Sequence, residues 1–212
     1  MIELFKSFFN LFQGWLVSKC DLNKGSKLRM KYSDELVKYI PSIERYGKCF
    51  NNQDKLPRGF LESKKFYLAF ENSLHCKGYI TEKFYRSSFL SNTVPVVWGT
   101  RKEDYLRIAP PHSFIHTEDF SSPKELSEYL LYLDSNVTAY REYFRWREDP
   151  NKSWDDVRKE AHLEHPKVKT HPGNVMGMDL VCDKFAKDKT TKIIHSLRKV
   201  VFGDESEECL ML

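Results

Sequence analysis

The chain has 212 residues, a net charge of +4 and 41% hydrophobic residues. This length allows one good hydrophobic core with a small appendage, and the composition is that of a globular domain. Basic and acidic side chains are mixed along the chain, which argues against a nucleic-acid-binding protein. The five cysteines contain no CxxC pair, so we expect no metal site. One or two disulfides would fit an oxidising compartment, and their pairing stays open.

Residues 1–13 are apolar but interrupted by polar side chains, and we expect an irregular lead-in to the domain. The uninterrupted apolar run is too short to span a membrane. The stretch also has neither the basic start nor the small-residue cleavage site of a signal peptide. No targeting or transmembrane segment is therefore visible in this chain.

The next elements alternate between strand and helix. Residues 14–18 form the expected first strand, and residues 21–29 are predicted to be a polar loop. A helix with one apolar stripe is expected to start near Met30 and to end at Pro41. A second short strand and a turn are predicted over residues 45–50.

The most informative stretch covers residues 65–99 and indicates strand, loop, helix and strand. The runs Phe66–Phe70 and Val94–Trp98 are short and wholly apolar, which is typical of a parallel sheet covered on both faces. Thr81 is the expected N-cap of the helix between them. A right-handed crossover would place both strands parallel. We therefore expect an α/β fold, a Rossmann-like parallel sheet with helices on both faces.

Polar residues follow the first of these strands, at the edge of the sheet where ligands usually bind. The helix that starts at Thr81 and Glu82 would present unpaired N–H groups and the positive end of its dipole. Lys83 adds a positive charge there, and Tyr79 adds a hydroxyl donor and a ring. This combination favours an anion, especially a phosphate or diphosphate.

After residue 99 we expect a loop over 100–112 and a short strand over 113–116. The pattern Ser122-Pro-Lys-Glu125 then predicts the start of a helix. A last helix is predicted over residues 139–147, where we expect some exposed aromatic side chains among Tyr140, Tyr143, Phe144 and Trp146.

The motifs Phe70-Glu-Asn-Ser73, Tyr79-Ile-Thr-Glu-Lys83 and Val94-Pro-Val-Val97 with Gly99 resemble, in this order, the donor-binding signature of the α-1,3/4-fucosyltransferases. These are inverting enzymes of the GT-B architecture that use GDP-fucose. The resemblance implies that residues 14–150 are a GDP-fucose-binding domain, the C-terminal half of a GT-B enzyme. Residues 151–212 would then be a charged C-terminal extension.

The resemblance also implies a set of residues that bind GDP-fucose: Arg29, Glu71, Asn72, Tyr79, Thr81, Glu82 and Lys83. An arginine suits the diphosphate because it stays charged and grips two oxygens at once. The two glutamates suit sugar or ribose hydroxyls. The family often has Ser-Asn after the first strand, where this chain has Ser18-Lys19, so that asparagine contact is missing here.

The implied function is transfer of L-fucose from GDP-fucose to an N-acetylglucosamine hydroxyl of a glycoprotein or glycolipid glycan. No metal or other cofactor is required. The family's catalytic base lies in the acceptor-side half, so no catalytic residue is assigned, and we expect the chain to be inactive alone. The implied location is the Golgi membrane or lumen, with membrane attachment only through an anchor not present in this chain.

Two alternatives differ in class from a fucosyltransferase. The first is a catalytically inactive nucleotide-sugar-binding module that regulates a full-length partner. The second is a dinucleotide-binding domain, against which the lack of a GxGxxG motif argues. The acceptor stays open between Lewis-type and core glycans, as does the linkage. Asn136-Val-Thr and Asn151-Lys-Ser are candidate N-glycosylation sites if the chain enters the secretory pathway.

Overall fold

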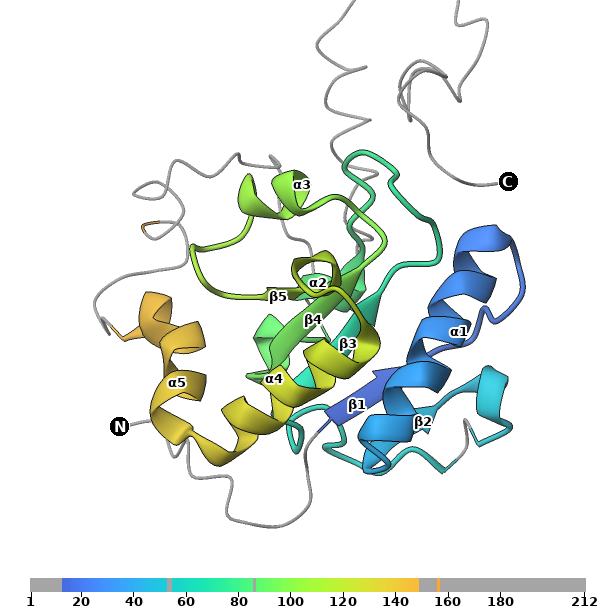
Figure 1. The fold of residues 1–212 in the computed structure, drawn as a ribbon, viewed down its shortest axis with the longest axis horizontal. Helices are drawn as coiled ribbons and strands as arrows, with labels where there is room; N and C mark the ends of the chain where they lie inside the picture. Colours follow the sequence, from blue (N-terminus) through green and yellow to red (C-terminus); the bar gives the residue numbers. More distant parts are fainter. Residues whose placement is uncertain (1–12, 53–54, 86, 149–155, 157–212) are drawn as a thin grey trace, which may run out of the picture.

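The computed structural model describes residues 13–52, 55–85, 87–148 and 156 (Figure 1). Five parallel strands form one sheet in the order β2-β1-β3-β4-β5. The strands are β1 (Gln13–Leu16), β2 (Ile43–Tyr46), β3 (Phe66–Phe70), β4 (Val94–Trp98) and β5 (Ile115–His116). The expected α/β fold with a parallel sheet is confirmed.

Helices follow the strands along the chain and cover both faces of the sheet. They are α1 (Lys24–Tyr39), α2 (Glu82–Tyr85), α3 (Lys102–Leu106), α4 (Pro123–Ser135) and α5 (Val137–Arg141). Short 3₁₀ turns lie at Lys48–Phe50, Phe89–Ser91, Thr117–Asp119 and Glu142–Arg147. In Figure 1, α1 and α4 lie in front of the sheet. Within the described stretches, no helix combines the length and the apolar character that a membrane span requires.

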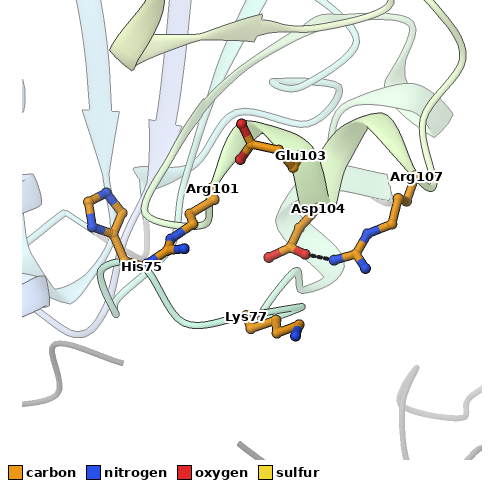
Figure 2. A pocket seen from close by; sticks show the side chains of 6 residues that line it. All are labelled: His75, Lys77, Arg101, Glu103, Asp104 and Arg107. Carbon is orange, nitrogen blue, oxygen red and sulfur yellow. Dashed lines mark hydrogen bonds and ion pairs between the residues drawn. The ribbon is translucent and has the colours of Figure 1, made fainter. Parts of the chain in front are cut away.

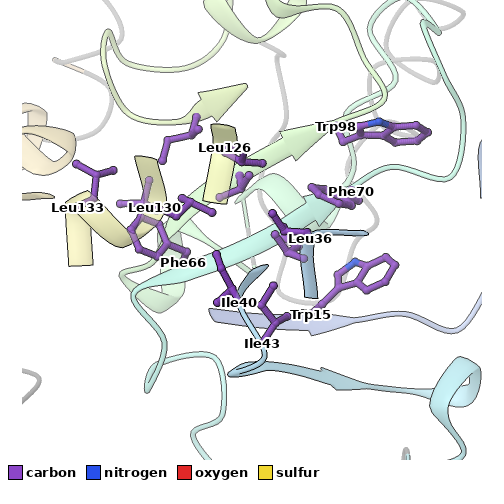
Figure 3. Packing of buried hydrophobic residues seen from close by; sticks show 14 of the residues in the cluster. Trp15, Leu36, Ile40, Ile43, Phe66, Phe70, Trp98, Leu126, Leu130 and Leu133 are labelled. Carbon is purple, nitrogen blue, oxygen red and sulfur yellow. The ribbon is translucent and has the colours of Figure 1, made fainter. Parts of the chain in front are cut away.

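Buried side chains from β3 form a core on each face of the sheet, because successive residues of a strand point in opposite directions. One core lies under α1 and α4 (Figure 3) and includes Phe66, Leu68, Phe70, Leu36 and Leu126. The other lies under α2 and α3 and includes Tyr67, Ala69, Phe84 and Tyr105. Burial on both faces explains why the strand is an unbroken apolar run.

The first helix begins earlier than its apolar stripe indicates. The side chain of Asn23 accepts a hydrogen bond from Ser26 N at 2.8 Å, and the Ser26 hydroxyl accepts one from Asn23 N at 2.9 Å. This reciprocal capping box starts α1 at Lys24. The prediction of a loop over residues 21–29 was therefore wrong, because two polar residues of that stretch cap a helix.

Two further predictions near the sheet edge need correction, one in full and one in detail. The predicted loop over residues 100–112 contains α3. The helix after Thr81 is a single turn that starts at Glu82, so Thr81 lies at the predicted N-cap position, but its hydroxyl donates to Glu71 at 2.7 Å and accepts from Lys83 Nζ at 2.8 Å. The Thr81 oxygen thus accepts from the Lys83 ammonium and not from a backbone N–H of the helix.

The aromatic side chains near the end of the described chain are not exposed. Tyr143 and Phe144 are 5% and 8% exposed and belong to the core under α1 and α4. Tyr140 and Trp146 are half-buried. The prediction of an exposed aromatic surface was wrong because α5 and the following 3₁₀ turn fold back onto β3 and α4.

Candidate functional site

A cavity lies where the order of the strands reverses. From β1 the chain passes to β2 on one side, and then to β3, β4 and β5 on the other. Such a switch point opens a crevice at the carboxyl ends of the strands, where open α/β sheets bind ligands. The cavity has a volume of about 430 Å³. Its lining residues are Leu16, Val17, Ser18, Lys19, Arg29, Tyr67, Asn72, Tyr79, Thr81, Glu82, Lys83 and Ser87.

The fold brings together the residues that the sequence assigned to donor binding, although they are spread over more than fifty positions (Arg29 to Lys83) of the chain. Every one of them except Glu71 lines this cavity. Glu71 lies directly behind the cavity wall and is completely buried. We call this cavity the switch-point cavity.

Glu71 accepts hydrogen bonds on both carboxylate oxygens. Its Oε1 accepts from Thr81 N at 2.8 Å and from the Thr81 hydroxyl at 2.7 Å. Its Oε2 accepts from Lys83 Nζ at 3.0 Å. A buried carboxylate is tolerated only when it is paired and hydrogen-bonded. Glu71 therefore fixes Thr81 and the Lys83 ammonium at the cavity wall.

Lys83 provides a positive charge at the start of α2. Its Nζ also donates to the Thr81 hydroxyl at 2.8 Å and lies 3.6 Å from Glu82 Oε1. The Lys83 side chain remains 19% exposed, toward the cavity that it lines. Because α2 is a single turn, its dipole is weak. Attraction of an anion here rests on charged side chains, not on the helix dipole that the sequence indicated.

Arg29 projects from α1 and is 2% exposed. Its Nη1 donates to Phe70 O at 2.7 Å, and its Nη2 donates to Lys19 O at 2.6 Å. The side chain thus joins the end of β3 to the loop after β1. Burial lowers the pKa of Arg29 and the Glu71 carboxylate raises it, but a guanidinium stays protonated in proteins.

A disulfide holds the same loop after β1. Cys20 is bonded to Cys49, with 5.6 Å between their Cα atoms. Cys49 lies in the 3₁₀ turn after β2, so the bond joins the carboxyl ends of two neighbouring strands. The backbone of Lys19 is therefore held both by the hydrogen bond from Arg29 and by the disulfide at the neighbouring Cys20.

Tyr79 and Asn72 form a second hydrogen-bonded unit of the cavity wall. The Tyr79 hydroxyl donates to Asn72 Oδ1 at 2.7 Å, and burial raises the pKa of that hydroxyl. The Tyr79 carbonyl accepts from the Thr100 hydroxyl at 2.5 Å. Sequence reasoning missed Thr100. Its signal is the placement of a polar residue two positions after β4, at the same edge as the polar residues after β3.

Two glycines pack closely against the backbone that follows Glu71. A Cβ atom on Gly25 would lie 2.7 Å from Asn72 O, and one on Gly99 would lie 2.6 Å from Ser73 O. Gly99 also has a φ of +112°, a backbone conformation that is strained for any residue with a Cβ atom. These glycines therefore allow α1 and the end of β4 to approach Asn72 and Ser73. Sequence reasoning did not assign them this role, and a lone glycine gives no signal of such distant contacts.

A second cavity, of about 400 Å³, lies between the loop after β3 and α3 (Figure 2). Asp104 accepts from Gly78 N at 2.9 Å and pairs with Arg107. His75 Nε2 lies 2.6 Å from Glu118 Oε1. The Gly78 bond holds the loop against α3, and the His75 contact holds it against the 3₁₀ turn at Thr117–Asp119. None of the predicted site residues lines this cavity. Across the described part of the chain, no group of three metal-ligating side chains is placed to hold a metal ion.

Comparison with protein families gives one match over most of the chain. The model described as glycosyltransferase family 10 (fucosyltransferase), C-terminal part, matches residues 10–200. Glycoprotein 3-alpha-L-fucosyltransferase A of Drosophila melanogaster is 45% identical over 139 residues, which cover 63% of this chain and 27% of that protein. The 4-galactosyl-N-acetylglucosaminide 3-alpha-L-fucosyltransferase 9 of Homo sapiens is also 45% identical over 139 residues, covering 64% and 36%. The chain thus spans about a third of these relatives.

Solved structures support the same relationship. A crystal structure of an alpha1,3-fucosyltransferase with GDP-fucose has a TM-score of 0.58 and 22% identity, over 87% of this chain and 49% of that one. A crystal structure of an alpha1,3-fucosyltransferase has a TM-score of 0.53 and 27% identity, over 68% and 39%. The first likeness shows the fold alone.

Proposed function

The chain belongs to glycosyltransferase family 10, the fucosyltransferases, and from that premise we propose that it is the donor-binding part of an α1,3-fucosyltransferase. It binds GDP-fucose, and the whole enzyme transfers L-fucose to an N-acetylglucosamine hydroxyl of a protein-linked or lipid-linked glycan. The observation that carries the proposal is the switch-point cavity, whose wall contains every predicted donor-binding residue except the buried Glu71.

Two cations suit the diphosphate of GDP-fucose. Arg29 and Lys83 both line the switch-point cavity, and each is held by hydrogen bonds to the protein before any ligand arrives. Charge-assisted hydrogen bonds to phosphate are among the strongest in proteins, and they need little reorganisation when the donors are already in place. Glu71 acts through Lys83 and Thr81. Glu82, whose side chain is 65% exposed, suits a hydroxyl of the ribose or the fucose.

In the transfer, the acceptor oxygen attacks C1 of fucose and the bond from C1 to the diphosphate oxygen breaks. Negative charge then increases on the departing GDP. Lys83 and Arg29 stabilise that charge from the donor side. The acceptor hydroxyl loses its proton to a base. The oxygens of Glu71 are already occupied by three donors, and Glu82 pairs with Lys83, so we assign the base to the acceptor-side half of the family's enzymes.

We place the enzyme in the Golgi lumen, attached to its membrane. The support from this chain is the Cys20–Cys49 disulfide. Structural disulfides persist in the secretory pathway and are rare in the cytosol. The family resemblance supports the same compartment.

Calorimetric titration of the purified chain tests donor binding. We expect GDP-fucose and GDP to bind, and a uridine diphosphate sugar to bind much more weakly. Transfer is then measured with the acceptor-side half of a family enzyme added in trans. A chain that binds no guanosine diphosphate under any of these conditions would refute the proposal. Binding without transfer in the presence of that half would instead favour the regulatory module.

A further inference from the structure

We propose that Asn136 carries an N-linked glycan, at the end of the sheet opposite the switch-point cavity. The inference goes beyond donor binding, and it depends on the proposed function only for the lumenal compartment. Asn136 begins the sequon Asn136-Val-Thr138. The acceptor motif alone is weak, because many sequons are buried or held in unsuitable places. The local structure supplies the stronger argument.

Asn136 lies at the junction of α4 and α5, and the fold uses only part of its side chain. Its backbone N–H donates to Tyr132 O at 2.9 Å and ends α4. Its Oδ1 accepts from Ala139 N at 3.0 Å and caps α5. The fold therefore depends on the carbonyl oxygen of the amide. Nδ2, the atom that would carry a glycan, contacts the Tyr132 hydroxyl at 3.1 Å on the exposed surface.

The modification is compatible with this capping geometry. A lumenal oligosaccharyltransferase uses a lipid-linked diphosphate oligosaccharide as donor. The bond from C1 of the first N-acetylglucosamine to the diphosphate breaks, and the lipid diphosphate leaves with the bonding electrons. A bond forms from C1 to Nδ2, which loses one proton to a base. One N–H remains on Nδ2, and Oδ1 keeps both lone pairs for the cap of α5.

Exposed apolar side chains lie in the sequon and on the last turns of α4 before it. Leu131, Tyr132 and Val137 are 46%, 49% and 53% exposed. Clustered exposed apolar groups favour aggregation unless something covers them. The first sugar rings of a glycan on Asn136 would lie over Tyr132, whose hydroxyl is in direct contact with Nδ2.

The position also leaves donor binding unobstructed. Lys65, which precedes β3, donates from Nζ to Asp134 O at 2.9 Å, and Tyr140 donates from its hydroxyl to Lys65 O at 2.8 Å. The junction of α4 and α5 is thus joined to the amino end of β3. The switch-point cavity lies at the carboxyl end, roughly 15 Å away along a strand of this length.

Peptide N-glycosidase digestion of the full chain tests the proposal. The chain is expressed in mammalian cells behind a cleavable secretory signal, and the protease-protected lumenal fraction is collected, so secretion is not required. Asn151→Gln removes the second sequon, which lies outside the described residues. We expect this variant to lose one glycan's mass on digestion, and residue 136 to take up ¹⁸O when digestion is done in labelled water.

Thr138→Ala in the Asn151→Gln background keeps Asn136 and its cap but destroys the sequon. We expect this variant to show no shift, and Thr138→Ser to restore the shift. An unshifted Asn151→Gln chain in the lumenal fraction would overturn the proposal. GDP-fucose titration of the same preparations separates this result from a failure of the proposed function, because binding does not depend on the glycan.

Discussion

The Nζ atom of Lys83 lies 3.0 Å from Oε2 of Glu71, a carboxylate with no solvent exposure. Lys83 itself is 19% exposed toward the switch-point cavity. The pair therefore links a buried anion to a cation that a ligand can reach. A phosphate that binds Lys83 enters a preformed charge arrangement in which Glu71 and Thr81 already fix the ammonium.

Lys83→Ala should reduce both donor binding and stability. Removal of the ammonium leaves Glu71 buried with only the two Thr81 donors, and breaking a buried ion pair costs about 3 kcal/mol or more. We expect the free energy of unfolding in urea to fall by about this amount and GDP-fucose affinity to fall by about tenfold or more. Lys38→Ala, at an exposed lysine of α1, is the control and should change neither.

Adding Glu71→Gln to Lys83→Ala separates the two effects. Glutamine removes the uncompensated charge while its carbonyl oxygen can still accept from Thr81. We expect the double variant to regain most of the lost stability and none of the lost affinity. Recovered binding in the double variant would show that Lys83 contributes only to folding.

Arg29→Lys tests whether the guanidinium holds two loops together. A lysine keeps the charge but cannot donate to both Phe70 O and Lys19 O in the same planar geometry. We expect a stability loss of about 2 kcal/mol, since each hydrogen bond to a charged donor contributes about 1.5–3 kcal/mol. GDP-fucose affinity should also fall. Unchanged melting and titration curves would show that the charge alone suffices.

Gly99→Ala should weaken donor binding by displacing the backbone after Glu71. The new Cβ would lie 2.6 Å from Ser73 O, in a residue with a φ of +112°. Gly78→Ala is a matched control from the same edge of the sheet, with a φ of +68° and no atom within 4 Å of its Cβ. The control should cost only the backbone strain of about 1 kcal/mol. Calorimetric titration should show a larger loss of affinity for Gly99→Ala than for Gly78→Ala.

The strands β3 and β4 could be predicted from the sequence because both of their faces are buried. Each strand is therefore an unbroken run of apolar residues. The starts of the helices could be predicted less well from the sequence. Asn23 and Ser26 resemble loop residues in composition, and only their mutual hydrogen bonds identify a capping box. Local composition does not distinguish a polar loop from a polar cap.

Most of the proposed donor-site residues could be named from a linear motif, but the separate structural role of each could not. Burial separates Glu71 and Arg29 from the rest of the set, and it depends on elements that are distant in the sequence. The contacts of Gly25 and Gly99 with the residues after β3 join positions far apart in the sequence. Such contacts exist only once the sheet has formed, so no spacing rule within one segment predicts them.

Replacing Cys20 and Cys49 by serine should lower the stability of the domain. The disulfide closes a loop with a sequence separation of 29 residues. The chain-entropy relation gives about 3–4 kcal/mol for a loop of this length. We expect the midpoint of urea unfolding to fall accordingly, and a reducing agent to lower the midpoint of the unsubstituted chain in the same direction. Donor affinity should fall as well, because the disulfide anchors Lys19, whose carbonyl binds Arg29.

Alkaline pH should unfold the domain through its buried tyrosines. Burial raises the pKa of Tyr32 to about 12, and it raises the pKa of Tyr67 and Tyr140 as well. Between pH 10 and pH 12 an unfolded tyrosine has lost its proton while folded Tyr32 retains it. The folded state therefore binds more protons in this range, and stability falls as pH rises.

Tyr32→Phe isolates one of these groups. The Tyr32 hydroxyl is buried and has no hydrogen-bond partner among the described residues, so its removal costs no hydrogen bond and relieves an unfavourable burial. We expect Tyr32→Phe to be as stable as the unsubstituted chain or more stable at neutral pH, and to lose less stability between pH 10 and pH 12. Urea unfolding at several pH values measures both effects. An equal loss in the two proteins over this range would mean that Tyr32 titrates normally in the folded state.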